Sequence, residues 1–188
     1  MDNTTCCSEW SNKLKTILFT EQQINERNTE LAKILSTEYK NKNVLCVGLM
    51  NGCLMFLTHL LEKVEFKYKL DFMTVSSYGH ETVSSGTVKI KKDLNIDPAG
   101  YDVLIIEDLI DTGITLDFVK KYLEGKKCNS IKICCLLDKK SRRLVDVNVD
   151  YVGFDCPNEF VIGYGMDFED EFRCIPFIGV MDINKLKF

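Results

Sequence analysis

The chain has 188 residues, with 24 Lys and Arg against 28 Asp and Glu, so its formal net charge is −4 at pH 7. This length predicts a single domain that can bury a full hydrophobic core without disulfides. The acidic balance leaves no basic excess to neutralise a phosphate backbone, so we expect no nucleic-acid partner, although a local site for a small anion is still compatible with it.

The nine cysteines predict free thiols rather than disulfides or a zinc site. Their number is odd, no CxxC motif occurs, and no Cys and His residues have zinc-binding spacing. The first residues, MDNTTCCSEWSNK, also lack the basic and apolar regions of a secretory signal. We therefore expect a cytoplasmic protein, because free thiols are typical of reducing compartments.

The first predicted elements follow from capping and periodicity. Thr20 and Gln23 form a capping-box pattern, which predicts a helix that extends to about Tyr39. Residues 43–61 carry no Asp, Glu, Lys or Arg, but Asn51-Gly52 is a turn signal, so a strand over 44–49 and a helix over 54–62 are expected instead of a membrane span.

Residues 65–72 alternate between polar and apolar types, which predicts a half-buried strand with Phe66, Tyr68, Leu70 and Phe72 on its apolar face. The small, polar residues 76–86 predict a long lid or binding loop, followed by a returning strand at 88–90. Apolar runs at 103–106, 131–137, 151–154 and 160–163 predict further strands, and 117–123 a helix. The alternation of strands and helices indicates an α/β fold with a mostly parallel sheet.

The most informative segment is 103–116. A buried strand ends in Glu107 and Asp108, and a loop with Asp111, Thr112 and Gly113 then leads into a helix. Ligands of open α/β sheets bind at the carboxyl ends of the strands, and amides at a helix start can hold a phosphate. Carboxylates beside a phosphate bind sugar hydroxyls or Mg²⁺. The segment therefore predicts a site for a phosphorylated sugar.

Two motifs limit the kind of nucleotide site. The spacing of a P-loop is absent from the segment. Gly163-Tyr164-Gly165 lacks the third glycine of a dinucleotide-binding fingerprint, so we interpret it as a turn.

The block from Glu107 to Thr115 resembles the phosphoribosyl-pyrophosphate (PRPP) motif of type I phosphoribosyltransferases. Further blocks resemble the hypoxanthine (guanine/xanthine) phosphoribosyltransferase branch, in order 47–52, 71–86, 136–139, 150–167 and 173–180. The resemblance covers about residues 14–180. It implies one phosphoribosyltransferase domain over 1–188, with a core at about 40–140, a mobile lid at about 77–88, and a hood built from the N-terminal residues and about 140–188.

The resemblance also implies an activity and its residues. The 5-phosphoribosyl group of PRPP would pass to N9 of a 6-oxopurine in the presence of Mg²⁺, with Asp111 as the catalytic carboxylate at the purine N7. PRPP binding is implied for Glu107, Asp108, Asp111, Thr112, Gly113, Ile114 and Thr115, and purine binding for Lys139, Phe160 and Val161. Pyrophosphate binding is implied for Asn51, Gly52 and Arg173, lid roles for Ser77 and Tyr78, and Mg²⁺ coordination for Glu107, Asp108 and Asp167. A homodimer or homotetramer is implied as well.

Two departures from the branch remove positive charge. Asn51 stands where the branch commonly has Lys, next to a peptide bond, Met50–Asn51, for which the resemblance implies the cis form. Val83 stands where close relatives often carry Lys.

Several residues also have a purely structural interpretation. Lys139 could belong to a solvated basic run, Phe160 to the core, and Arg173 to a surface ion pair. Two other functions also fit the PRPP motif: a non-catalytic PRPP-sensing regulator, and a transferase for adenine or a pyrimidine. Lys139 argues against the second, because an ammonium group favours an oxo acceptor.

Overall fold

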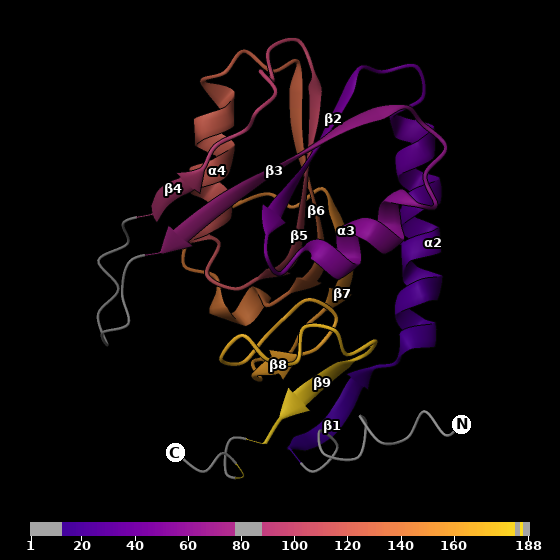
Figure 1. Cartoon of the computed structure of the whole chain (residues 1–188), viewed down its shortest axis with the longest axis vertical. Helices are drawn as coiled ribbons and strands as arrows, with labels where there is room; N and C mark the ends of the chain where they lie inside the picture. Colours follow the sequence, from indigo (N-terminus) through magenta and orange to yellow (C-terminus); the bar gives the residue numbers. More distant parts are fainter. Residues whose placement is uncertain (1–12, 78–87, 183–184, 186–188) are drawn as a thin grey trace.

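A computed structural model describes residues 13–77, 88–182 and 185, and it contains two sheets of different size (Figure 1). The large sheet has the strand order β4-β3-β2-β5-β6-β7, and all its neighbouring strands are parallel except β3 and β4. Its strands are β2 (Val44–Met50), β3 (Tyr68–Ser77), β4 (Val88–Lys92), β5 (Asp102–Ile110), β6 (Ser130–Asp138) and β7 (Tyr151–Asp155). The mostly parallel α/β fold is therefore confirmed.

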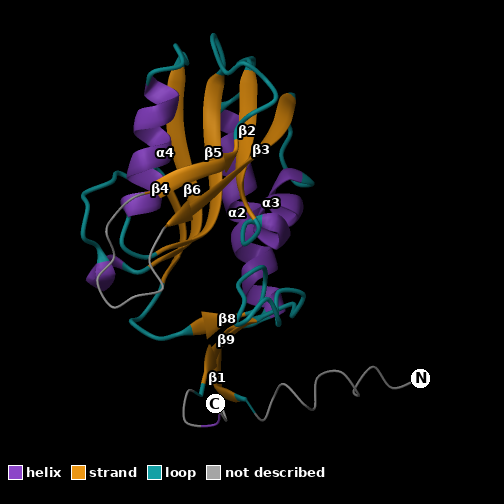
Figure 2. Cartoon of the chain, turned by 60° about the vertical axis from the view of Figure 1, so that its left-hand side comes forward, coloured by secondary structure: helices purple, strands orange, loops and turns teal. Residues whose placement is uncertain are grey.

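Helices cover both faces of the large sheet, which explains its continuous apolar runs. Leu104 and Ile106 of β5 pack with α2 (Glu21–Glu38) and α3 (Leu54–Leu61). Val103 and Ile105 face the other way and pack with α4 (Ile114–Glu124). Figure 2 shows α4 apart from α2 and α3, with the sheet between them. Because side chains alternate along a strand, burial of both faces requires apolar residues at every position.

The capping box at the start of α2 is confirmed. The Thr20 hydroxyl accepts a hydrogen bond from the Gln23 amide at 3.3 Å, and the Gln23 side chain accepts one from the Thr20 amide at 2.9 Å. The charge-free segment folds into β2, a turn and α3, as predicted. Within the described ranges, no helix combines the length and apolarity that a membrane span needs.

The small sheet joins the two ends of the chain. It has the order β1-β9-β8, with β1 (Leu14–Phe19) and β8 (Val161–Ile162) both antiparallel to β9 (Ile178–Met181). It lies at one end of the molecule, toward which the β2 arrow points (Figure 1). The strand β1 was not predicted from local pattern. The returning strand β4 was predicted, and it pairs antiparallel with β3.

The cysteines that the structure describes are all free thiols, as predicted: Cys46, Cys53, Cys128, Cys134, Cys135, Cys156 and Cys174. Most of them are buried, and burial raises the pKa of thiols such as Cys46 and Cys134. They therefore behave as small apolar groups of the core. Cys6 and Cys7 lie outside the described residues.

The predicted inner face of the strand over 65–72 is confirmed at Phe66, which is buried, and at Phe72, which packs against the core, but it is wrong at two positions of β3. Tyr68 and Leu70 are 39% and 37% exposed, whereas Asp71 is 4% exposed and Met73 is fully buried. The strand thus turns its charged position inward, against the simple alternation of apolar and polar residues.

Hydrogen bonds to the Asp71 carboxylate account for this reversal. It accepts the backbone amides of Phe72, Asn95 and Ile96 at 2.6–2.8 Å and lies 3.5 Å from the Lys92 ammonium. Burial raises the pKa of Asp71, but these donors outweigh burial and hold that pKa below its usual range. Asp71 therefore ties the segment after β4 to the sheet.

Replacing Asp71 with Ala should destabilise the fold by about 2–3 kcal/mol at pH 7, because buried amides would lose their acceptor. The pKa of Asp71 is lower in the folded state, so its stabilisation is complete at neutral pH and is lost as pH falls through the folded pKa. Urea denaturation at pH 7 and pH 3 measures both effects. Asp155→Ala is the control, since that side chain is 74% exposed and should change stability little. Equal effects of the two substitutions would contradict the assignment.

Candidate active site

The acidic pair at the end of β5 is the most perturbed group of the site. Oε2 of Glu107 is buried and has no hydrogen-bond partner among the described residues. Burial, with the neighbouring charge of Asp108, raises the pKa of Glu107 well above its usual value. Burial likewise raises the pKa of Asp108 to about 6. A buried carboxylate oxygen that lacks a protein partner is suited to a cation or to ligand hydroxyls.

A loop and a turn close in on the acidic pair. The loop follows β2, and its Met50–Asn51 peptide bond is cis, as the resemblance implied. A Cβ added at Gly52 would collide with the Asp108 carboxylate, and one added at Gly165 would collide with the Gly52 carbonyl oxygen. Segments from three distant parts of the sequence therefore touch through glycine backbone.

The turn that contains Gly165 is the predicted one. Gly163, Tyr164 and Gly165 have φ angles of 92°, 49° and 104°, all in the left-handed region. The Gly165 carbonyl accepts a hydrogen bond from Arg173 Nη1 at 2.9 Å, and Arg173 Nη2 lies 2.8 Å from Asp167 Oδ1. Arg173 and Asp167 are thus oriented by the turn and by each other.

The loop between β5 and α4 lines a small hollow of about 100 Å³. Glu107, Asp111, Thr112, Gly113 and Thr115 contribute to its wall. Gly113 has φ +84°, and a Cβ there would lie 2.9 Å from the Val145 carbonyl oxygen. The helix begins at Ile114, three residues before the predicted 117, because the Gly113 conformation lets the chain enter it directly. The hollow therefore adjoins the amino end of α4, where anions are stabilised.

The same loop is braced by the segment after β6. The Thr112 carbonyl accepts hydrogen bonds from the amides of Leu144 and Val145 at 2.9 and 3.2 Å. The Asp111 carboxylate accepts a hydrogen bond from Arg142 Nε at 2.8 Å, and both side chains are about half exposed. The backbone of the loop is thus held from outside, while one face of it lines the hollow.

Lys139 is buried, with 6% exposure. Its amide donates to the Ile110 carbonyl at 2.9 Å, so it lies beside the strand end that precedes Asp111. No carboxylate in the described part of the chain pairs with its ammonium. The neighbouring Asp138 pairs instead with Arg143, and both of these side chains are mostly buried. The solvated interpretation of Lys139 is therefore wrong, whereas Lys140 is exposed and pairs with Asp155.

The remaining purine candidates lie at the small sheet. Phe160 is 41% exposed and makes an edge contact with Phe168, with ring centroids 5.8 Å apart. Val161 is buried in β8. An exposed ring fixed by a neighbouring ring offers a face to a planar ligand. Tyr78, which was predicted to belong to a lid, lies outside the described residues, as does the side chain of Ser77, the last residue of β3.

Sequence comparison assigns the chain to a family. A model of the phosphoribosyl transferase domain matches residues 16–169. The chain belongs to the phosphoribosyltransferase family.

Two curated relatives illustrate the range of this family. The chain is 44% identical over 168 residues to a hypoxanthine-guanine phosphoribosyltransferase of Bacillus subtilis, which covers 89% of this chain and 93% of that protein. It is 46% identical over 170 residues to a bifunctional protein TilS/HprT of Listeria monocytogenes. There it covers 90% of this chain but spans only 26% of the relative.

Solved structures show the same fold. A hypoxanthine phosphoribosyltransferase of Staphylococcus aureus superposes with a TM-score of 0.92 and 40% identity, covering 96% of this chain and 98% of that one. The type I phosphoribosyltransferase fold is therefore confirmed for this chain.

The acidic side chains of the site bear on whether the protein can hold a cation. No group of three or more His, Cys, Asp or Glu side chains could hold a metal within residues 13–77, 88–182 and 185. The unpartnered Glu107 oxygen and the raised pKa of Asp108 nevertheless fit Mg²⁺, which is commonly held by one or two carboxylates together with substrate phosphates. Asp167 is engaged by Arg173 and is not part of a protein-only cluster.

Sequence reasoning missed three residues that brace the site. Asp138 and Arg143 form a mostly buried ion pair, and Arg142 contacts Asp111. They stand in a run of basic residues, 139–143, that resembles an ordinary solvated surface. The one available signal was the position of the run directly after a buried strand end.

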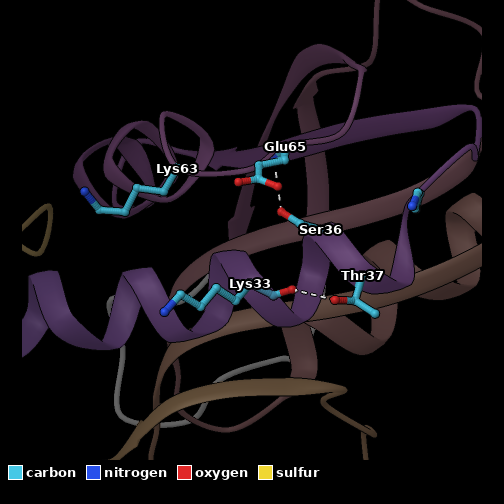
Figure 3. Close-up of a pocket in the computed structure, with 6 residues that line it drawn as sticks. Lys33, Ser36, Thr37, Lys63 and Glu65 are labelled. Carbon is cyan, nitrogen blue, oxygen red and sulfur yellow. Dashed lines mark hydrogen bonds between the residues drawn. The ribbon is translucent and has the colours of Figure 1, made fainter.

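A larger hollow, of about 430 Å³, lies elsewhere, between α2 and the segment after α3 (Figure 3). Lys33, Lys40 and Lys63 border it, but Ser36 and Thr37 already donate their hydroxyl hydrogens to helix carbonyls, and Glu65 adds a carboxylate. It contains none of the predicted site residues.

Asp108→Asn should raise the free energy of unfolding by about 1 kcal/mol at pH 7.5 in the presence of a chelator. The pKa of Asp108 is raised to about 6 in the folded state, so its favourable protonated form is lost as pH rises through that value. The difference in the free energy of unfolding between the variant and the wild type should be smaller at pH 5. Urea denaturation at the two pH values measures this difference.

Added Mg²⁺ should stabilise the wild-type protein more than Asp108→Asn. Asp146→Asn, at an exposed position, is the control and should respond to Mg²⁺ as the wild type does. A Mg²⁺ response that survives in Asp108→Asn would remove Asp108 from the cation site.

Proposed function

We propose that the protein transfers the 5-phosphoribosyl group of PRPP to N9 of a 6-oxopurine, either hypoxanthine or guanine, with xanthine as a third candidate. The C1′–N9 bond forms, the C1′–O bond to pyrophosphate breaks, and the products are a nucleoside monophosphate and pyrophosphate. The observation that carries the proposal is the buried Lys139 side chain, which pairs with no carboxylate of the described residues and lies beside the loop from Asp111 to Thr115. A buried cation without a carboxylate is costly unless a ligand acceptor reaches it.

The ribose 5-phosphate binds in the loop from Asp111 to Thr115. Its support is the hollow at the start of α4, where amides and hydroxyls offer donors to an anion. Glu107, in the wall of the same hollow, and the adjacent Asp108 accept hydrogen bonds from the ribose hydroxyls. This placement leaves C1′ facing the pyrophosphate loop at Gly52.

The purine binds between Lys139 and the small sheet. Lys139 donates to the 6-oxo group, Phe160 stacks on the ring, and the Val161 backbone meets the base edge. Asp111 accepts or shuttles the N7 proton as N9 attacks C1′, and such general-base action contributes about 10²–10⁴-fold. Arg142 must then share or release the Asp111 carboxylate when the base arrives.

Pyrophosphate leaves toward Asn51, Gly52 and Arg173. Glu107, Asp108 and Asp167 are the residues that would hold Mg²⁺, and the ion would neutralise charge on the leaving group. The Arg173 guanidinium is already held by the Gly165 carbonyl and by the Asp167 and Asp170 carboxylates, so little side-chain ordering remains on binding. Ser77 and Tyr78 belong to a lid that excludes water, which would otherwise hydrolyse PRPP.

The proposal extends to organisation in the cell. The single domain divides into a core at about 40–140, a lid at about 77–88 and a hood that includes the small sheet. The protein acts in the cytoplasm as a homodimer or homotetramer. Free thiols at all described cysteines support a reducing compartment.

Asp111→Asn should lower kcat by about 10²-fold or more, while Lys139→Ala should raise the purine KM by about 10- to 100-fold. Asparagine keeps the shape of the carboxylate but cannot take a proton. Initial rates with PRPP and hypoxanthine or guanine measure both values.

Lys140→Ala is the matched control for Lys139→Ala, because the adjacent ammonium is exposed and pairs only with Asp155. Wild-type turnover in Asp111→Asn together with an unchanged purine KM in Lys139→Ala would refute the assignment. Binding of PRPP and guanine without pyrophosphate release would indicate a regulator instead.

Asn51→Lys should lower the KM for PRPP by about threefold, since it adds a charge next to pyrophosphate. The measurement is the PRPP dependence of the initial rate at a saturating purine concentration. An unchanged KM would mean that the backbone of this loop, rather than its side chain, contacts pyrophosphate.

A further inference from the structure

A buried polar cluster joins the turn at Tyr164 to two helices. Asn28 Nδ2 of α2 donates to the Tyr164 hydroxyl at 2.8 Å, and His59 Nδ1 of α3 lies 2.8 Å from the same oxygen. Tyr164 and Asn28 are 2% and 0% exposed. Burial raises the pKa of Tyr164 to about 12, so the hydroxyl keeps its proton at neutral pH.

The turn that carries Tyr164 also touches two of the residues proposed to bind pyrophosphate, Gly52 and Arg173. Gly165 lies directly against the Gly52 carbonyl oxygen. Its amide donates to the Arg173 carbonyl at 2.8 Å, and its carbonyl accepts from the Arg173 guanidinium at 2.9 Å. Any displacement of Tyr164 would therefore move Arg173 relative to Gly52.

The helix α3 provides a second contact between the Gly52 segment and the Tyr164 turn. It begins at Leu54, directly after the Gly52 loop, and His59 lies on it. One end of this segment touches the turn through Gly52 and Gly165, and the other end touches it through His59 and Tyr164. Two contacts at separate points fix an orientation that one contact would leave free to rotate.

Tyr164 also needs an anchor for its own backbone. Its φ of +49° lies in the left-handed region, which a non-glycine residue seldom adopts without support. The Tyr164 amide donates to the Ile175 carbonyl at 2.8 Å, and the hydroxyl makes the two contacts described above.

We propose that Tyr164, held by His59 and Asn28, is a positioning residue that sets the separation between the Gly52 loop and Arg173 at the pyrophosphate end of the site. This inference rests on the proposed function. It assigns no contact with substrate to Tyr164, which acts through Gly165 and Arg173.

The purine end should depend little on this cluster. The Lys139 amide is tied to the Ile110 carbonyl, and the Phe160 carbonyl accepts from the Met181 amide at 2.8 Å. These anchors belong to the large sheet and to β9, not to the Tyr164 turn. Loss of the Tyr164 hydroxyl should therefore weaken PRPP binding and leave purine binding nearly unchanged.

Tyr164→Phe keeps the ring and removes the hydroxyl. We expect the KM for PRPP and the Kd for magnesium pyrophosphate, measured by calorimetry, to rise about fivefold, the equivalent of one net hydrogen bond. The KM for hypoxanthine should stay within about twofold of wild type. A purely structural role would not produce this split between the two substrates.

Tyr39→Phe is the matched control, since the Tyr39 hydroxyl is buried and has no hydrogen-bond partner among the described residues. Both of its KM values should equal those of wild type. His59→Asn, which keeps a polar group near the Nδ1 position, should restore most of the PRPP affinity that His59→Leu loses. The two His59 variants also test the inference if Tyr164→Phe fails to fold.

An unchanged KM for PRPP in Tyr164→Phe and His59→Leu would overturn the positioning role, as would an equal rise in both substrates' KM values. If the wild-type protein released no pyrophosphate from PRPP and a 6-oxopurine, the proposed function would fail instead. The magnesium pyrophosphate Kd of the two variants would then still decide the positioning role by itself.

Discussion

The structure depends on two carboxylates at the end of a strand that is buried on both faces. Glu107 and Asp108 resist ionisation there, yet Gly52 packs directly against the Asp108 carboxylate and Gly165 against Gly52. A side chain at either glycine would displace the acidic pair or separate the small sheet from the large one. The close approach of backbone to carboxylate thus sets how the three parts of the site meet.

Charges at this site lack the protein partners that a stable core would supply. Lys139 is buried and pairs with no carboxylate of the described residues, and Oε2 of Glu107 has no hydrogen-bond donor there. Each group costs folding free energy. Polar groups fixed in advance around a ligand need no reorganisation during the reaction, which is the usual reason for retaining them.

In the loop between β5 and α4, the backbone is held more firmly than the Asp111 side chain. The Thr112 carbonyl and the Gly113 backbone are packed against the segment after β6, so the loop cannot shift far from the start of α4. Asp111 is held only by a half-exposed contact with Arg142. A rigid loop backbone beside an adjustable carboxylate suits the proposed reaction, in which a bound phosphate would stay in place while a proton moves.

Sequence pattern predicted those parts of the fold that depend on residues close together in the chain. The capping box of Thr20 and Gln23 marked the start of α2, and apolar runs marked the buried strands, because both faces of the sheet had to be covered. The strand β1 escaped prediction since its partner, β9, lies at the other end of the chain. The inner face of β3 was wrong at Tyr68 and Leu70 because Asp71 gains more from three amide donors than alternation alone suggests.

The sequence by itself determined the family, the mostly parallel α/β fold and the choice of 111–115 as the candidate phosphate loop, since these follow from strand runs, glycine positions and carboxylates close together in the chain. Only the tertiary structure decided that Lys139 is buried while Lys140 is solvated, that Arg142 contacts Asp111, and that Tyr164 links two helices to the turn that meets Gly52. Such relations depend on which distant backbone segments pack together, and no spacing along the chain encodes them.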